Sequence, residues 1–213
     1  MPKISTQYLS RLPGVAELES LLKSLAMLDA IMRSEWEYRY YSFNAKWGKG
    51  KRMGSMRNGS GDEFFALFNN YGCFMKGFQH ESPVASMPEI KSQLYDGVPT
   101  ELHGGVTEPA FAPDDVTFCI WRAADGSRWE RARVKLPKDI DPDGSAYLLS
   151  PLDGNPKTYG KFAEEYYEVE VDLEIVAAIY EHQPLTKAMA LGLNAEADWK
   201  DIKKDAKQIA YPL

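Results

Sequence analysis

The sequence predicts an α+β fold, in which one antiparallel, meander-type sheet of about six strands follows a long N-terminal helix and precedes a helical C-terminal third. Three observations carry this prediction. Apolar residues recur every three or four positions from Pro13 to Arg33, alternation typical of strands begins at Ser34, and helical spacing returns after Pro137. We expect a single domain over residues 1–213, with the helix in 1–33, the sheet in 34–135 and the helical part in 136–213.

The N-terminal helix is predicted from an apolar stripe. Leu18, Leu22, Leu25 and Leu28 fall on one side of a helix. Leu21 widens the stripe, so we expect the helix to lie against the sheet rather than to stand alone.

Six segments have the pattern of strands. They are the stretch that begins at Ser34 and residues 52–56, 62–68, 73–78, 116–121 and 128–135. We expect tight turns between neighbouring strands at Asn58-Gly-Ser-Gly61 and Asn69-Asn-Tyr-Gly72. Tight hairpins need a positive φ, which Asn and Gly accept. Residues 79–113 are proline-rich and irregular, and we expect a long loop there, which is a common place for binding groups.

The C-terminal third contains signals for several helices. We expect helices from residue 145, from Asn155-Pro156 to about residue 168, over residues 173–182, over residues 186–192 and after Asn194. The predicted N-caps of the last four are Asn155, Asp172, Thr186 and Asn194, whose side-chain oxygens can accept from free N–H groups in the first turn.

Charge and composition favour a cytoplasmic protein that binds neither nucleic acid nor membrane. The net charge is −6, which repels phosphate backbones at long range. Basic residues surround Trp47 between Lys46 and Arg52, and this segment is either a solvated loop or a contact for a polyanion. The first residues lack the apolar core of a secretory signal, and no apolar run is long enough to span a bilayer.

The two cysteines, Cys73 and Cys119, lie within apolar strand patterns. We expect buried, reduced thiols, although a disulfide would be possible if their strands were neighbours.

A calcium loop is one possible site. Asp139, Asp141 and Asp143 alternate before Gly144, which is typical of the opening of such a loop. Position twelve is Ser150 rather than Glu, so the alternative is a polar turn that caps the next helix.

A catalytic site is the second possibility. His80 and Glu81 follow the fourth predicted strand and have the side chains of general acid–base catalysis. With Asp62, His103 and Arg122 they would form the pocket of a hydrolase-like enzyme acting on a small molecule. The glycine loop at residues 58–61 leads into a strand rather than a helix, so it predicts no phosphate-binding cofactor site.

Aromatic residues give the third possibility, a surface that binds a partner protein. Trp, Tyr and Arg dominate the energetics of protein interfaces. If helices cover only one face of the sheet, the other face could present several of these rings, whereas the alternative is that they are core. The candidate partner-binding residues are Trp36, Tyr38, Tyr40, Trp47, Trp121 and Trp129.

Three segments carry a resemblance to known proteins. Residues 34–44, 56–68 and 76–82, together with Thr117-Phe-Cys-Ile-Trp121, resemble a group of conserved bacterial proteins to which no function is assigned. The layout is more loosely similar to that of the SUKH immunity superfamily, which places helices around one antiparallel sheet and neutralises toxins by binding them. This similarity implies a non-catalytic, immunity- or regulator-like binding protein without a cofactor.

Overall fold

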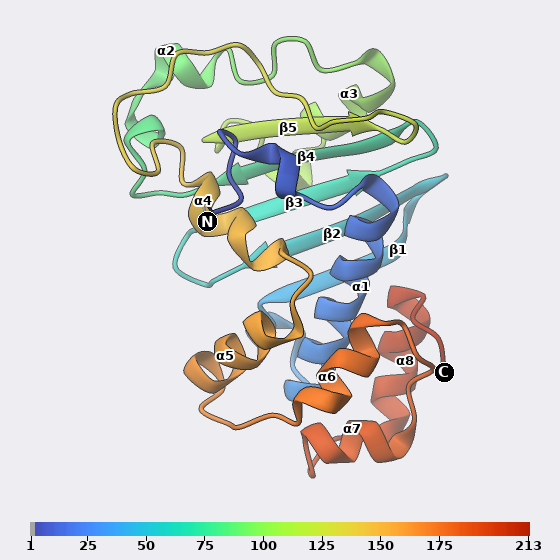
Figure 1. The fold of residues 1–213 in the computed structure, drawn as a ribbon. Helices are drawn as coiled ribbons and strands as arrows, with labels where there is room; N and C mark the ends of the chain where they lie inside the picture. Colours follow the sequence, from blue (N-terminus) through green and yellow to red (C-terminus); the bar gives the residue numbers. More distant parts are fainter. Residues whose placement is uncertain (1–2) are drawn as a thin grey trace.

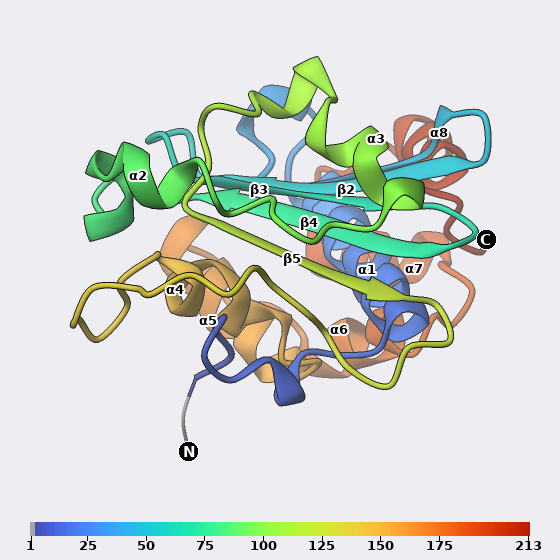
Figure 2. The ribbon, with the colours of Figure 1, turned by 90° about the horizontal axis from the view of Figure 1, so that it is seen from above.

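The computed structural model describes residues 3–213, which form a five-stranded antiparallel sheet between two layers (Figures 1 and 2). The strands are β1 (Tyr41–Gly48), β2 (Lys51–Arg57), β3 (Glu63–Phe68), β4 (Gly72–Phe78) and β5 (Phe118–Ala123). They pair in chain order, and every neighbouring pair is antiparallel. The predicted antiparallel meander is confirmed, with five strands rather than six.

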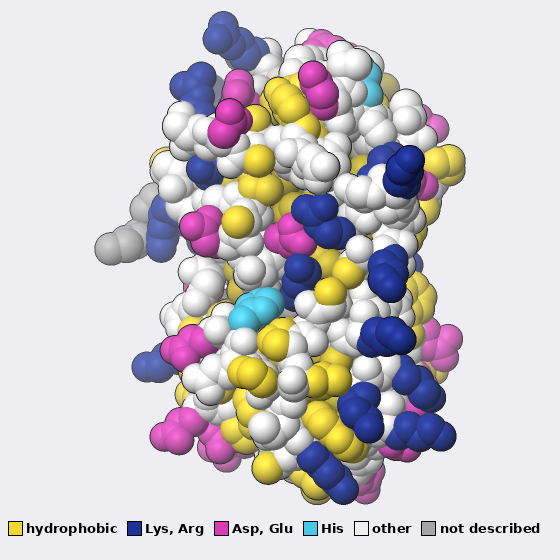
Figure 3. All heavy atoms as spheres, turned by 90° about the vertical axis from the view of Figure 1, so that its right-hand side faces the viewer, with side chains coloured by type: hydrophobic (Ala, Val, Ile, Leu, Met, Phe, Trp, Pro, Cys, Tyr) yellow, Lys and Arg dark blue, Asp and Glu magenta, His cyan; other side chains and the backbone are white. Residues whose placement is uncertain are grey.

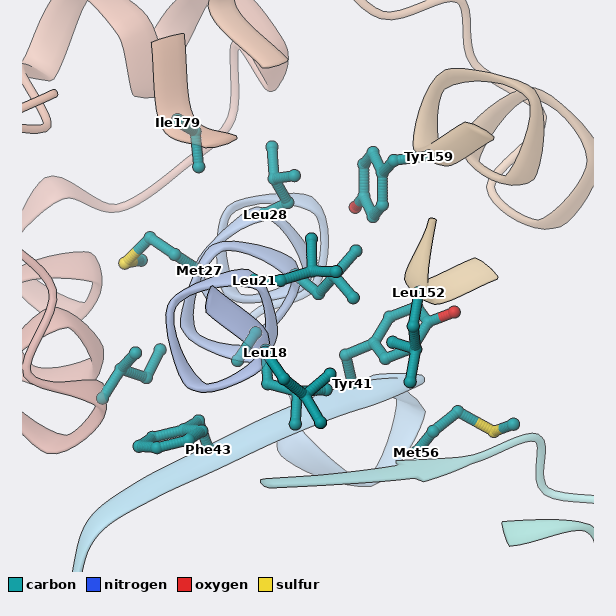
Figure 4. Packing of buried hydrophobic residues seen from close by; sticks show 14 of the residues in the cluster. Leu18, Leu21, Met27, Leu28, Tyr41, Phe43, Met56, Leu152, Tyr159 and Ile179 are labelled. Carbon is teal, nitrogen blue, oxygen red and sulfur yellow. The ribbon is translucent and has the colours of Figure 1, made fainter. Parts of the chain in front are cut away.

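Helices from both ends of the chain cover one face of the sheet (Figure 2). They are α1 (Val15–Met32), α4 (Ser145–Leu149), α5 (Pro156–Tyr166), α6 (Leu173–Tyr180), α7 (Lys187–Leu193) and α8 (Trp199–Ile209). α1 is surrounded by side chains from the strands, such as Tyr41 and Phe43, and from the C-terminal helices, such as Tyr159 and Ile179 (Figure 4). The predicted N-terminal helix and its apolar packing are therefore confirmed.

Capping side chains mark where the C-terminal helices begin. Asn155, Asp172 and Thr186 accept hydrogen bonds from backbone N–H groups in the first turns of α5, α6 and α7, as predicted. The prediction for α8 is wrong, because its N-cap is Asp198. The side chain of Asn194 instead donates to a carbonyl in the last turn of α1 at 2.8 Å.

Residues 79–116, here named the insertion, cover the opposite face of the sheet (Figure 2). They contain the short helices α2 (Pro88–Lys91) and α3 (His103–Val106). Phe65 and Phe74 of the sheet pack with Phe111 of the insertion in a second apolar core. Both faces of the sheet are therefore buried, so the open aromatic face that the sequence suggested does not exist.

A buried lysine holds the insertion on the sheet. Lys76 of β4 is fully buried, and its ammonium donates to the carbonyls of Ala112, at 2.9 Å, and Asp115. A buried ammonium needs such acceptors, because an unpaired charge in an apolar core is very unfavourable.

Two of the predicted strands have other structures. Trp36–Tyr38 form a 3-10 helix, and β1 begins only at Tyr41. Residues 128–135 contribute a single bridge from Glu130 to β5 rather than a sixth strand. Side chains in this segment bind the N-terminal segment instead: Trp129 Nε1 donates to the carbonyl of Pro13 at 2.8 Å. Further 3-10 helices are Leu9–Arg11, Pro83–Ser86, Thr100–Leu102, Pro109–Phe111 and Ser150–Leu152.

The cysteines are buried, free thiols on opposite faces of the sheet. Cys73 packs on the helical side and Cys119 on the insertion side, so a disulfide between them is sterically impossible in this fold. None of the helices within residues 3–213 combines the length and the apolar composition that a membrane span requires.

Candidate functional site: a tyrosine-lined cleft

A cleft of about 490 Å³ lies between α5, the segment around α4, and the beginning of β1 with the end of β2. We call it the tyrosine cleft. Its volume falls within the range of sites that bind a small molecule or a partner's side chain. Six aromatic residues line it: Tyr40, Tyr41, Tyr147, Tyr159, Phe162 and Tyr180.

Helix α5 presents one aromatic face to the cleft. Tyr159, Phe162 and Tyr166 are spaced three and four residues apart, so they lie on the same side of the helix. The ring of Tyr40 meets this face, with its centroid 4.8 Å from Phe162 and 5.2 Å from Tyr166. The cap at Asn155 sets where α5 begins and therefore where these rings point.

The aspartate-rich loop before α4 positions Tyr147. Asp141 accepts hydrogen bonds from the backbone N–H groups of Ala146 and Tyr147, both at 2.9 Å. The hydroxyl of Tyr147 then lies 3.5 Å from that of Tyr40 at the cleft. These contacts favour the predicted alternative of a helix-capping turn.

The same loop does not converge on a cation site. Asp143 is buried and binds the hydroxyls of Thr6, at 2.5 Å, and Ser145, at 2.6 Å. Asp139 accepts from the backbone of its own turn. Within residues 3–213, no group of three or more His, Cys, Asp or Glu side chains is arranged to hold a metal ion.

Asp29 lies behind the cleft wall and connects three elements. This side chain of α1 is fully buried. Its carboxylate accepts from the backbone N–H of Tyr41 at 2.7 Å and from the hydroxyl of Tyr159 at 2.9 Å. Burial outweighs these hydrogen bonds and raises the pKa of Asp29 to about 6.

Four of the cleft phenols have a raised pKa. Burial, followed by the hydrogen bond with Tyr147, raises the pKa of Tyr40 well above its usual range. Burial is also the main cause that raises the pKa of Tyr41, Tyr159 and Tyr180. Phenols with a raised pKa keep their protons, so the cleft offers apolar rings and neutral donors rather than a nucleophile.

The structure separates the predicted partner-binding residues. Trp36 and Tyr38 are 53% and 58% exposed on the 3-10 turn before β1, and Tyr40 lines the cleft. Trp47 is half-buried, and its ring stacks on the insertion. Trp121 and Trp129 are each 5% exposed. They belong to the two cores on opposite faces of the sheet, so neither contributes to an exposed surface.

Three of the five predicted catalytic residues, Asp62, His80 and Glu81, meet at the end of β4. His80 Nδ1 lies 2.7 Å from the carboxylate of Asp62, which is itself nearly buried. Asp62 also accepts from the side chain of Asn58 and from the backbone of His80. Glu81 lies 3.9 Å from the other ring nitrogen and is exposed. This cluster closes the β2–β3 turn against the strand end.

The other two predicted catalytic residues lie at the opposite end of the sheet. Asn69 in the β3–β4 turn donates to the carbonyl of Glu101 at 2.8 Å, which places His103 beside that turn. Arg122 pairs with the first residues of β4. The length of β4, about 20 Å at ~3.4 Å per residue, therefore separates His103 from His80. The structure does not bring the five side chains into one pocket.

Comparison with models of protein families, with curated proteins and with solved structures found no match for this chain.

Sequence reasoning found Tyr40 but missed most of the cleft. Asp29 could have been recognised, because it is an acidic residue within the apolar stripe of a predicted helix. The aromatic spacing of Tyr159, Phe162 and Tyr166 was also visible, but a helical stripe of rings normally indicates core.

Proposed function

We propose that the protein is a non-catalytic binding module that contacts a partner protein through the tyrosine cleft and the exposed rings beside it. The observation that carries this proposal is the open cleft next to large apolar side chains that remain in solvent. Tyr147 and Tyr166 are 49% and 41% exposed, and both contact Tyr40. Trp36 and Tyr38 are two further exposed rings, on the turn that leads into Tyr40 and outside the lining of the cleft. We call these five residues the aromatic surface.

The rings of this surface are held in place before any partner binds. Phe162 stacks on Tyr166 with 5.3 Å between centroids, and the guanidinium of Arg57 lies 5.0 Å from the ring of Trp36. A rigid aromatic anchor loses little conformational entropy on binding, which is why Tyr and Trp dominate interface hot spots. A pocket beside such rings can accept one anchoring side chain of a partner.

The chemistry of the cleft supports binding rather than catalysis. No histidine or cysteine occurs among the described residues that line it. Its charged groups are Lys3, Lys161, Asp153 and Glu165, which balance one another. These features suit recognition of an apolar side chain with polar atoms at its edge.

Affinity capture from a native lysate tests the proposal. The wild type is compared with Tyr38→Ala and Tyr166→Ala, which remove exposed rings of the aromatic surface. Tyr71→Ala is the matched control, because Tyr71 is 38% exposed in the distant β3–β4 turn. We expect a protein that the wild type and the control recover but the two variants lose. Equal recovery by all four proteins, or no recovered protein together with a strictly monomeric state, contradicts the proposal.

A further inference from the structure

The aromatic surface borders a segment that carries charge of one sign. Residues 162–186 contain seven acidic residues and no lysine or arginine. Six of them lie in the short stretch that joins the second half of α5 to the start of α6, and all six are exposed. They are Glu164, Glu165, Glu168, Glu170, Asp172 and Glu174.

No salt bridge within residues 3–213 involves these carboxylates. Asp172 binds only the N–H groups of its own helix. Lys and Arg side chains instead line one edge of the face that carries α8 and the β1–β2 turn (Figure 3).

Apolar side chains alternate with these acids. Tyr166, Val169 and Leu173 are 41%, 39% and 42% exposed, although each lies between carboxylates. Tyr166 belongs to the aromatic surface, and Glu165 lines the tyrosine cleft itself. The acidic segment and the aromatic surface thus share the last turn of α5, which carries Glu164, Glu165 and Tyr166.

From this arrangement we infer that the partner is a basic protein that places an apolar side chain in the tyrosine cleft and surrounds it with lysine and arginine. This inference rests on the proposed function and adds the chemistry of the partner. Protein interfaces combine an apolar centre with a polar rim, and charge complementarity at the rim speeds association and excludes partners of the wrong sign. The balanced charges in the cleft suit the apolar anchor, and the exposed carboxylates beside it suit the basic rim.

A synthetic peptide serves as the probe: a dye-labelled nonamer with one central tryptophan flanked on both sides by lysine and arginine. Two control peptides replace the basic residues by glutamate or the tryptophan by glycine. Fluorescence anisotropy at about 50 mM and about 300 mM salt measures the affinity, because screening weakens contacts between exposed charges at the higher concentration. We expect the basic peptide with tryptophan to bind most tightly and to lose affinity at high salt.

Matched variants locate the binding site. The acidic variant combines Glu164→Gln, Glu168→Gln and Glu170→Gln. The control variant removes the same number of charges on the insertion side and combines Glu81→Gln, Glu89→Gln and Glu101→Gln. All six side chains are exposed, so both variants should fold as the wild type does. We expect the acidic variant to bind the basic peptide about tenfold more weakly and the control variant to bind as the wild type does.

Three results would overturn the inference. They are an equal loss of affinity in both variants, equal binding of the basic and the acidic peptide, and the absence of binding at low salt. Failure of this inference can be distinguished from failure of the proposed binding function. If a captured partner depends on Tyr38 and Tyr166 but is retained by the acidic variant, the binding function stands and the inference about a basic partner is wrong.

Discussion

The carboxyl group of Asp29 should make the stability of the protein depend on pH in a way that one substitution removes. The side chain is fully buried and accepts hydrogen bonds from Tyr41 and Tyr159. Burial raises its pKa from 3.8 to about 6. In the unfolded chain the pKa returns to about 3.9.

The sign of the effect follows from proton uptake on folding. Between about pH 4 and pH 6 the folded protein retains the proton of Asp29, whereas the unfolded chain has lost it. Rising pH therefore lowers the free energy of unfolding across this window, and the contribution becomes constant above about pH 6. A shift of two pKa units corresponds to about 3 kcal/mol, of which about 2 kcal/mol falls between pH 4.5 and pH 7.5.

Asp29→Asn keeps the shape of the side chain but cannot ionise. Its carbonyl can accept from the N–H of Tyr41, and its amide can donate to the hydroxyl oxygen of Tyr159. We expect the free energy of unfolding of the variant, relative to the wild type, to rise by about 2 kcal/mol from pH 4.5 to pH 7.5. Urea unfolding followed by tryptophan fluorescence at several pH values measures this difference.

The control is the same substitution in an exposed turn, Asp125→Asn, which separates the effect of burial from that of removing one carboxyl group from the protein. Two results refute the reasoning. In the first, the difference in free energy of unfolding between Asp29→Asn and the wild type stays constant with pH within about 0.5 kcal/mol. In the second, this difference changes with pH in the opposite direction. Either result would mean that folding does not change the proton affinity of Asp29 as its burial requires.

Three further substitutions test the packing of the fold. Burial lowers the pKa of Lys76 to about 8, so with rising pH the folded protein releases this proton before the unfolded chain does. The free energy of unfolding should therefore rise from about pH 8 to about pH 10. In urea unfolding, Lys76→Met should lack this rise. Asn155→Ala removes the cap of α5 and should lower the free energy of unfolding by about 1 kcal/mol in the same assay. In Gly105→Ala the new Cβ would overlap the ring of Phe74, so thermal denaturation should show a free energy of unfolding lower by about 1–3 kcal/mol. The control is Gly48→Ala, whose Cβ meets only ordinary contacts and should lower the free energy of unfolding much less.

Local signals in the sequence predicted those elements that local interactions determine. Asn155 and Thr186 begin helices because their side chains bind N–H groups two or three residues away. The prediction of a strand at residues 128–135 is wrong because the residues that hold this segment in place lie far away in the sequence. Trp129 and Arg131 bind carbonyls in the N-terminal segment, more than a hundred residues earlier in the chain, and alternation of side chains carries no information about such partners.

The candidate site was less predictable than the fold for a related reason. The insertion covers the second face of the sheet with Leu94, Leu102 and Phe111, which lie between prolines and have no regular period. Without periodicity, the sequence of an apolar layer has the pattern of a loop. The sequence therefore predicts exposure for aromatic residues that this layer covers in the structure. The cleft itself joins segments that are far apart in the sequence, so only the packed structure brings Tyr40 and Tyr147 together.

Asp29 connects the stability of the fold with the geometry of the cleft. An apolar residue at this buried position would avoid the cost of an ionised carboxyl at neutral pH, so stability alone does not account for the choice of Asp. The carboxyl does, however, fix the hydroxyl of Tyr159 in the cleft wall and the backbone of Tyr41 at the start of β1. A group that lowers stability while it orients two residues of one cleft is typical of a binding site, where local stability is exchanged for a defined arrangement of side chains. The position of Asp29 therefore supports our proposal that the tyrosine cleft binds a partner.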